Sequence, residues 1–158
     1  MEPRISLEAA PKGALQAMQG LEAYVRGSGL ERSLLELLKT RVSQINGCAY
    51  CIDMHTKDAR LHGETEQRLY ALSAWRETPF FSERERAMLE WAEALTLISE
   101  NHVSDDLYDQ VRQHFTEAEL VNLSVATVAI NGWNRFCISF RAVPGTYQPA
   151  EAAEAAHR

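Results

Sequence analysis

Two cysteines and a histidine fall at helical spacing just after residue 47. Cys48 and Cys51 are three residues apart, and His55 follows four residues later. Residues three and four apart share one face of an α-helix, so these side chains form one stripe if a helix begins at or just after Gly47. A cysteine thiolate is a nucleophile, and histidine is a base near neutral pH. The spacing therefore predicts thiol chemistry assisted by a base.

The expected position of both cysteines at the start of a helix favours their reactivity. Unpaired backbone N–H groups and the helix dipole stabilise negative charge there, which lowers the pKa of a thiol. The C-x-x-C spacing also allows a disulfide without large strain. Oxidation of one thiolate to a sulfenic acid, followed by condensation with the second thiol, would give that disulfide. Two thiols and a base therefore indicate peroxide reduction or thiol–disulfide exchange.

Buried packing and metal binding are the other interpretations of this motif. Zinc prefers four ligands and the motif supplies three, so Cys137 or His62 would have to complete the site. Cys137 lies in an apolar segment and is expected to be a small buried hydrophobe. His62 falls at a predicted helix end, where it can pair with the dipole. We favour redox chemistry and predict no metal and no cofactor.

The segments that must position the motif are predicted to be helices. Apolar residues recur at helical spacing along the chain, and the sequence contains no convincing strand pattern, internal repeat or interdomain linker. We therefore expect an all-α fold of about six or seven helices in a single domain, residues 1–158. The segments expected to be helical are about 11–26, 31–45, 48–62, 65–73, 82–99, 104–115 and 116–140.

A fourth group joins the motif if the second and third helices form an antiparallel hairpin across Asn46 and Gly47. Glu36 lies ten residues before Asn46, or roughly 15 Å along its helix at 1.5 Å per residue. His55 lies seven residues after Cys48, or roughly 10–11 Å along the next helix. The two side chains are then level to within about one turn. Glu36 points away from the leucine face of its helix, which fits a polar pocket and solvent exposure equally well.

The last and longest expected helix, about residues 116–141, is apolar nearly all round. A helix that is apolar on every side is usually buried on every side. We therefore expect it to be a central helix or to lie in a subunit interface.

Composition and charge argue against several classes of partner. The net charge of −6 and the pI near 5.4 disfavour binding to nucleic acid or to anionic membranes, which need a basic surface. The first residues contain no apolar leader, and the longest apolar run is too short and polar to span a membrane. We therefore expect a cytoplasmic protein with no nucleic-acid or membrane partner, in a compartment that keeps structural disulfides reduced.

The order of Glu36, Cys48, Cys51 and His55 resembles the alkylhydroperoxidase AhpD core within the carboxymuconolactone decarboxylase superfamily. The similarity extends from about residue 15 to residue 142, which we take as the core of the domain. One position departs from the pattern, because AhpD has a histidine directly before the second cysteine and this chain has Tyr50. Three other segments are also similar to AhpD-like proteins: Arg41–Cys48, Trp91–Thr96 and Asn131–Arg135.

The resemblance implies an AhpD-like helical bundle that assembles as a homo-oligomer, often a trimer or hexamer. It also implies that Glu36 and His55 relay protons while Cys48 and Cys51 reduce a peroxide with electrons from a dithiol reductant. Cys51 is nearer to His55 and would attack the peroxide, with Cys48 resolving it. The helix-terminus argument instead makes Cys48 the thiol of lower pKa, so the order stays open.

Two further functions are weighed against the peroxidase. The superfamily's other branch suggests a lactone-decarboxylating lyase, whose reaction does not use thiols. A redox-sensing oligomer would form the disulfide between Cys48 and Cys51 without catalytic turnover. The cysteine pair favours peroxidase or thiol–disulfide oxidoreductase activity over the lyase.

Overall fold

A computed structural model describes residues 2–6 and 9–149 of the chain. Within these ranges the chain forms eight α-helices and the 3-10 helix η2, with no strand, in agreement with the predicted all-α fold. The seven expected helical segments all contain helices, and the structure adds the short helix α6 and the 3-10 helix η2. The elements are α1 (Lys12–Arg26), α2 (Arg32–Asn46), α3 (Ala49–Leu61), α4 (Glu66–Ala71), η2 (Leu72–Glu77), α5 (Glu83–Thr96), α6 (Ile98–Asn101), α7 (Asp105–Arg112) and α8 (Glu117–Phe140).

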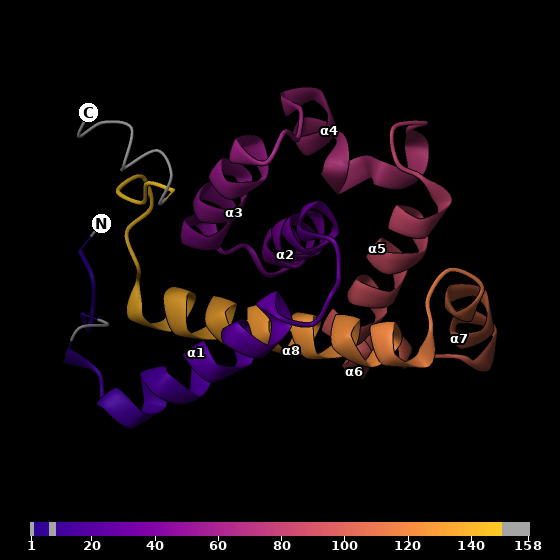
Figure 1. Cartoon of the computed structure of the whole chain (residues 1–158). Helices are drawn as coiled ribbons and strands as arrows, with labels where there is room; N and C mark the ends of the chain where they lie inside the picture. Colours follow the sequence, from indigo (N-terminus) through magenta and orange to yellow (C-terminus); the bar gives the residue numbers. More distant parts are fainter. Residues whose placement is uncertain (1, 7–8, 150–158) are drawn as a thin grey trace.

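Helix α2 lies at the centre of the molecule, where Figure 1 shows it nearly end-on between α3, α5 and α8. Residues 34–40 of α2 are all buried. The buried stretch includes polar side chains as well as leucines, because neighbouring helices also cover the face that carries Glu36, Thr40 and Ser43. The polar face of α2 is therefore part of the protein interior.

Helix α8 runs beneath α2 and also packs against α1 and α5 (Figure 1). One side of α8 contributes the fully buried residues Leu123, Ala126 and Ile130. Its other side carries Val121 and Val128, which are 59% and 61% exposed. Within one chain, α8 is therefore buried on one side only. Among the helices of residues 2–6 and 9–149, none is long and apolar enough to cross a membrane.

A left-handed glycine ends α2 and starts the turn into α3. Gly47 has φ 70° and ψ 31°, a conformation that other residues rarely adopt. Its N–H donates to the carbonyl of Gln44 at 3.3 Å, and the N–H of Cys48 donates to the carbonyl of Ser43 at 3.0 Å. These two bonds form a Schellman motif. Helix α3 then runs back along α2, as the predicted hairpin requires.

Three amide side chains attach this turn to α8. The Asn46 Nδ2 donates to the Oδ1 atoms of Asn131 at 3.0 Å and Asn134 at 2.8 Å. The Nδ2 of Asn134 donates in turn to Ser43 Oγ at 3.0 Å. Because Asn134 is fully buried, its amide is costly to leave unpaired, so the bonds favour one position of the turn. The residues immediately before Cys48 are fixed in this way.

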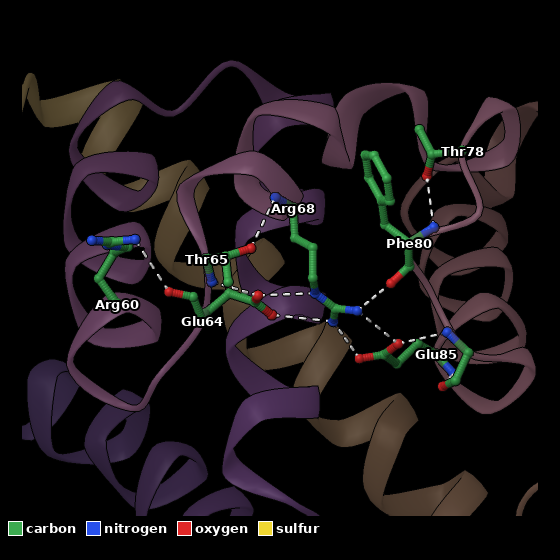
Figure 2. Close-up of polar contacts among 8 residues, drawn as sticks. Arg60, Glu64, Thr65, Arg68, Thr78, Phe80 and Glu85 are labelled. Carbon is green, nitrogen blue, oxygen red and sulfur yellow. Dashed lines mark hydrogen bonds and ion pairs between the residues drawn. The ribbon is translucent and has the colours of Figure 1, made fainter.

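A second polar network fixes the chain after α3 (Figure 2). Arg68 of α4 pairs with Glu64 (Nε to Oε1, 2.9 Å) and with Glu85 (Nη2 to Oε1, 2.5 Å). Its Nη1 also donates to the backbone carbonyl of Phe80. Glu64 precedes α4 and Glu85 lies in the first turn of α5, so one guanidinium joins three segments. The network holds the far end of α3 against the start of α5.

Candidate active site

The two cysteines of the motif form a disulfide at the start of α3. Their Cα atoms are 5.4 Å apart, within the ordinary range for a disulfide. Cys48 is the N-cap residue of α3, and its Sγ accepts the N–H of Cys51 at 3.4 Å. Both residues are buried, each with 1% exposure. The local fold therefore places two sulfurs together where backbone N–H groups favour negative charge.

His55 and Glu36 meet across the hairpin. The Nδ1 atom of His55 is 2.8 Å from Oε2 of Glu36. His55 is 4% exposed and Glu36 is 7% exposed, so the contact is shielded from water. The sequence left open whether Glu36 lies in a polar pocket or in solvent. In the structure it lies in a polar part of the interior.

The pKa of Glu36 reflects opposing effects. Burial alone would raise this pKa, but the hydrogen bond and charge of His55, with the positive charges of Lys39 and Arg32, hold it below its ordinary value of 4.5. Glu36 is then a carboxylate at neutral pH and can only accept a hydrogen bond. We infer that His55 carries its proton on Nδ1. In the neutral ring this leaves Nε2 free to accept a proton.

A cavity of about 610 Å³ lies beside this pair. Cys51, His55 and Glu36 line the cavity, whereas Cys48 is not among its lining residues. A molecule in the cavity would therefore lie beside Cys51 rather than Cys48. Apolar side chains from α1, α2, α3, α8 and the loop between α1 and α2 form much of the wall: Val25, Leu30, Leu35, Met54, Leu61 and Trp133.

Asp58 adds a second carboxylate to the cavity wall. Its carboxylate lies within 4.8 Å of the ligand atoms of both Glu36 and His55. The phenol of Tyr147 donates to Oδ1 of Asp58 at 2.8 Å. Burial is the main cause that raises the pKa of Tyr147, and the hydrogen bond and charge of Asp58 raise it further. The phenol is therefore a proton donor at neutral pH.

The segment after α8 is held against α3 by two more hydrogen bonds. The N–H of Gly145 donates to Oδ2 of Asp53 at 3.0 Å, and the Nζ of Lys57 donates to the carbonyl of Tyr147 at 3.0 Å. Tyr147 thereby becomes part of the cavity wall. Tyr147 therefore adds to a candidate site whose cysteines, His55 and Glu36 come from α2 and the start and middle of α3.

Cys137 of α8 and Tyr50 also line the cavity. The sulfur of Cys137 lies within 4.8 Å of the sulfurs of both Cys48 and Cys51. Burial raises the pKa of Cys137 to about 11. Burial also raises the pKa of Tyr50, with further contributions from Cys137 and Asp53. Cys137 is buried as predicted, but it belongs to the site rather than to a distant part of the core.

Among the residues that the structure describes, two groups of three side chains have ligand atoms close enough to hold a metal ion. The first is the three-cysteine group, in which two sulfurs already share a disulfide. The second is Glu36, His55 and Asp58, whose atoms already bond to one another or to Tyr147. His62, considered above as a fourth ligand, lies at the C-cap of α3 and belongs to neither group.

Three residues of the site were not predicted from the sequence, and they differ in how far the sequence pattern could have indicated them. Asp58 lies three residues after His55, so helical spacing could have placed it on the reactive stripe. Cys137 lies four residues after Trp133, which puts both on one face of α8, but only the fold shows which helix that face meets. Tyr147 lies in an irregular segment and carried no sequence signal.

Comparison with known proteins gives a consistent family. The sequence model of the "Carboxymuconolactone decarboxylase family" matches residues 12–94. The uncharacterized protein YdfG of Bacillus subtilis is 49% identical over 140 residues, which cover 88% of this chain and 95% of YdfG.

Two further relatives link the chain to AhpD. A crystal structure of an Agrobacterium tumefaciens protein of unknown function, for which a role in antioxidant defence as AhpD has been suggested, is 43% identical. Its TM-score is 0.89, and the match covers 92% of this chain and 100% of that protein. The alkyl hydroperoxide reductase AhpD of Hyphomonas neptunium is 42% identical over 43 residues, or 27% of this chain and 24% of that AhpD. The helical arrangement is thus AhpD-like.

Proposed function

Since the chain belongs to the carboxymuconolactone decarboxylase family, we propose that it is an AhpD-like peroxidase that uses a dithiol as reductant. One observation carries this proposal. Cys51, which shares a disulfide with Cys48, lines the same cavity as the hydrogen-bonded pair of Glu36 and His55. The site thereby combines a redox-active pair, a base and room for a substrate.

The first step is attack of the Cys51 thiolate on a peroxide. His55 takes the thiol proton at Nε2, while Glu36 holds the opposite ring nitrogen. The sulfur then bonds to one peroxide oxygen, the O–O bond breaks, and Cys51 becomes a sulfenic acid. The departing alkoxide takes the proton from His55 and leaves as an alcohol. We assign the attack to Cys51 because this cysteine, and not Cys48, lines the cavity.

The second step closes the disulfide. The Cys48 thiol condenses with the Cys51 sulfenic acid, so that an S–S bond forms and water leaves. An external dithiol then reduces this disulfide by exchange and departs as a disulfide of its own. The position of Cys48 at the N-cap favours its release as a thiolate during reduction, because the backbone N–H of Cys51 points at its sulfur.

The cavity favours an organic hydroperoxide over hydrogen peroxide as substrate. Its volume of about 610 Å³ is in the range of sites that hold small organic molecules. Apolar side chains such as Leu35, Met54 and Trp133 could cover a hydrocarbon body while the peroxide group meets Cys51. The class of substrate in this proposal is therefore an alkyl or aryl hydroperoxide.

We propose that the protein assembles as a homo-oligomer, a trimer or hexamer. It would act in the cytoplasm, where thiols are kept reduced between turnovers. Exposed apolar residues on one side of α8, Val121 and Val128 among them, support self-association, since a second copy could bury them. Sedimentation velocity would measure the subunit number directly.

Replacement of the attacking thiol tests the peroxidase. Cys51→Ser should reduce hydroperoxide-dependent oxidation of a dithiol such as dihydrolipoamide to the rate without protein, because serine cannot form a sulfenic acid. The dithiol is followed by its thiol content, and circular dichroism checks that the variant is folded. Full activity in both Cys51→Ser and Cys48→Ser would show that the mechanism is wrong.

Two measurements distinguish the peroxidase from the lyase and from the redox sensor. A lyase of the decarboxylase type would continue to turn over after alkylation, whereas the proposed cycle would stop. A redox sensor would form the Cys48–Cys51 disulfide once with peroxide and would show no turnover when a dithiol is supplied.

A further inference from the structure

Cys137 is a buried thiol that the proposed cycle does not use. It lies near the end of α8, far from the C-x-x-C motif in sequence, yet its sulfur is within 4.8 Å of the sulfurs of Cys48 and Cys51. Cys137 is the free cysteine of the chain, because the other two share the disulfide. All three cysteines of the sequence are therefore gathered at one point.

The cavity distinguishes among the three sulfurs. Cys51 and Cys137 both line it, whereas Cys48 does not. A disulfide between Cys51 and Cys137 would lie on the cavity wall. To form it, two sulfurs that are at most 4.8 Å apart must approach to about 2.05 Å.

We propose that Cys137 is a third redox-active thiol of this site, which forms a disulfide with Cys51 in place of Cys48. When Cys51 is a sulfenic acid, the Cys137 thiol condenses with it, so that an S–S bond forms and the hydroxyl leaves as water with the thiol proton. When Cys48 and Cys51 are already joined, the Cys137 thiolate attacks Cys51 and the Cys48 thiolate leaves. The second route conserves electrons, because one S–S bond replaces another.

The surroundings of the three thiols set their order of use. Cys48 sits at the N-cap, where the N–H of Cys51 stabilises its thiolate. Burial raises the pKa of Cys137 to about 11, so its thiolate is scarce at neutral pH. Cys48 is then the usual partner of Cys51, and Cys137 acts when Cys48 is unavailable or by exchange with the Cys48–Cys51 disulfide.

The Cys48→Ser variant isolates the proposed reaction. Serine is a preferred N-cap residue, so α3 should still form, and only Cys51 and Cys137 remain. The reduced variant is treated in separate arms with one equivalent of cumene hydroperoxide or of diamide, an azo oxidant that takes two electrons and two protons from two thiols. In both arms we expect the loss of two thiols per chain. A digest made without reductant should then contain a pair of peptides joined by a disulfide between Cys51 and Cys137.

Cys48→Ser combined with Cys137→Ala is the matched control, and a gel without reductant excludes links between chains. The control should lose at most one thiol with the hydroperoxide and should give a dimedone adduct at Cys51. The role of Cys137 rests on the proposed function only in the hydroperoxide arm, because diamide can oxidise the two thiols whether or not the protein is a peroxidase. A linked pair with diamide alone would support the role of Cys137 and count against peroxidase activity. Absence of the linked pair in both arms, in a folded variant, would overturn the role of Cys137.

Discussion

Burial alone would raise the pKa of Glu36, but the hydrogen bond with His55 and nearby positive charges lower it, so Glu36 remains ionised in a buried position. His55 donates to it, and the charges of Lys39 and Arg32 add to that effect. A buried carboxylate without such partners would be protonated instead. In the proposed mechanism Glu36 therefore acts through His55 as a positioning residue, since it fixes which ring nitrogen carries the proton.

Glu36→Gln should lower the rate of dithiol-dependent hydroperoxide reduction by about 100-fold, in line with the contribution of a positioned base. A glutamine amide can donate as well as accept, so it no longer keeps Nε2 of His55 as the acceptor. The comparison is kcat/KM for cumene hydroperoxide in the variant and in Glu66→Gln, a control on α4 whose side chain is 59% exposed. Equal rates in the wild type and Glu36→Gln would show that Glu36 has no role in hydroperoxide reduction.

The same variant has a signature in stability that depends on pH. The pKa of Glu36 is lowered in the folded protein, so its ionised form contributes stability above the ordinary value of 4.5, and this contribution is lost as the pH falls through the lowered folded-state pKa. The difference in unfolding free energy between wild type and Glu36→Gln should therefore be largest near neutral pH and shrink below about pH 4.5. Urea titrations at several pH values measure it.

Residue positions within the hairpin could be predicted because the α-helix is regular. A rise of about 1.5 Å per residue was enough to place Glu36 level with His55, which the structure finds in contact. Whether the polar face of α2 meets water or another helix is not encoded by that spacing. It depends on α3 and α8, whose packing no single-sequence pattern determines.

The turn between α2 and α3 sets where the reactive helix begins. Gly47→Ala should destabilise the protein by about 1–2 kcal/mol, because a side chain is unfavourable in the left-handed conformation that Gly47 adopts. No atom lies within 4 Å of the Cβ that alanine would add, so the cost comes from the backbone alone. Urea unfolding measures the change in free energy.

Gly20→Ala is the matched control for this substitution. Gly20 lies inside α1, and nothing lies within 4 Å of the Cβ that alanine would add there. Alanine at a helical glycine should stabilise the protein by about 0.5–1 kcal/mol. Changes of opposite sign in the unfolding free energy would support the role of the left-handed turn at Gly47. An unchanged unfolding free energy in Gly47→Ala would show that the Schellman motif is not needed to start α3.

Helices were the most predictable elements, since apolar spacing and capping residues mark them locally. Capping boxes, in which Ser82 pairs with Glu85 and Thr116 with Glu119, begin α5 and α8. Depth of burial was less predictable. The near-uniform apolar character of α8 suggested burial all round, whereas α2 with its polar residues is the central helix and α8 exposes Val121 and Val128.

At the scale of the whole molecule, the site forms where four helices and the segment after α8 converge. The sequence predicted the positions of Glu36, Cys48, Cys51 and His55 on the α2–α3 hairpin, but Asp58 on the same hairpin was missed. The sequence could not supply Cys137 or Tyr147, since both reach the cavity through contacts between segments about ninety residues apart. The apolar side of α8 is also a property of the assembled chain, and it is the surface on which the proposed oligomer depends.

A thiol count after a peroxide pulse shows whether the protein reduces a hydroperoxide with its Cys48–Cys51 pair. Fully reduced wild-type protein receives one equivalent of cumene hydroperoxide per chain, is quenched with an alkylating agent, and is mapped by mass spectrometry. We expect loss of two thiols per chain, a peptide that contains the Cys48–Cys51 disulfide, one equivalent of alcohol, and full recovery of the thiols with a dithiol. Retention of three alkylated cysteines alongside unreacted hydroperoxide would contradict it.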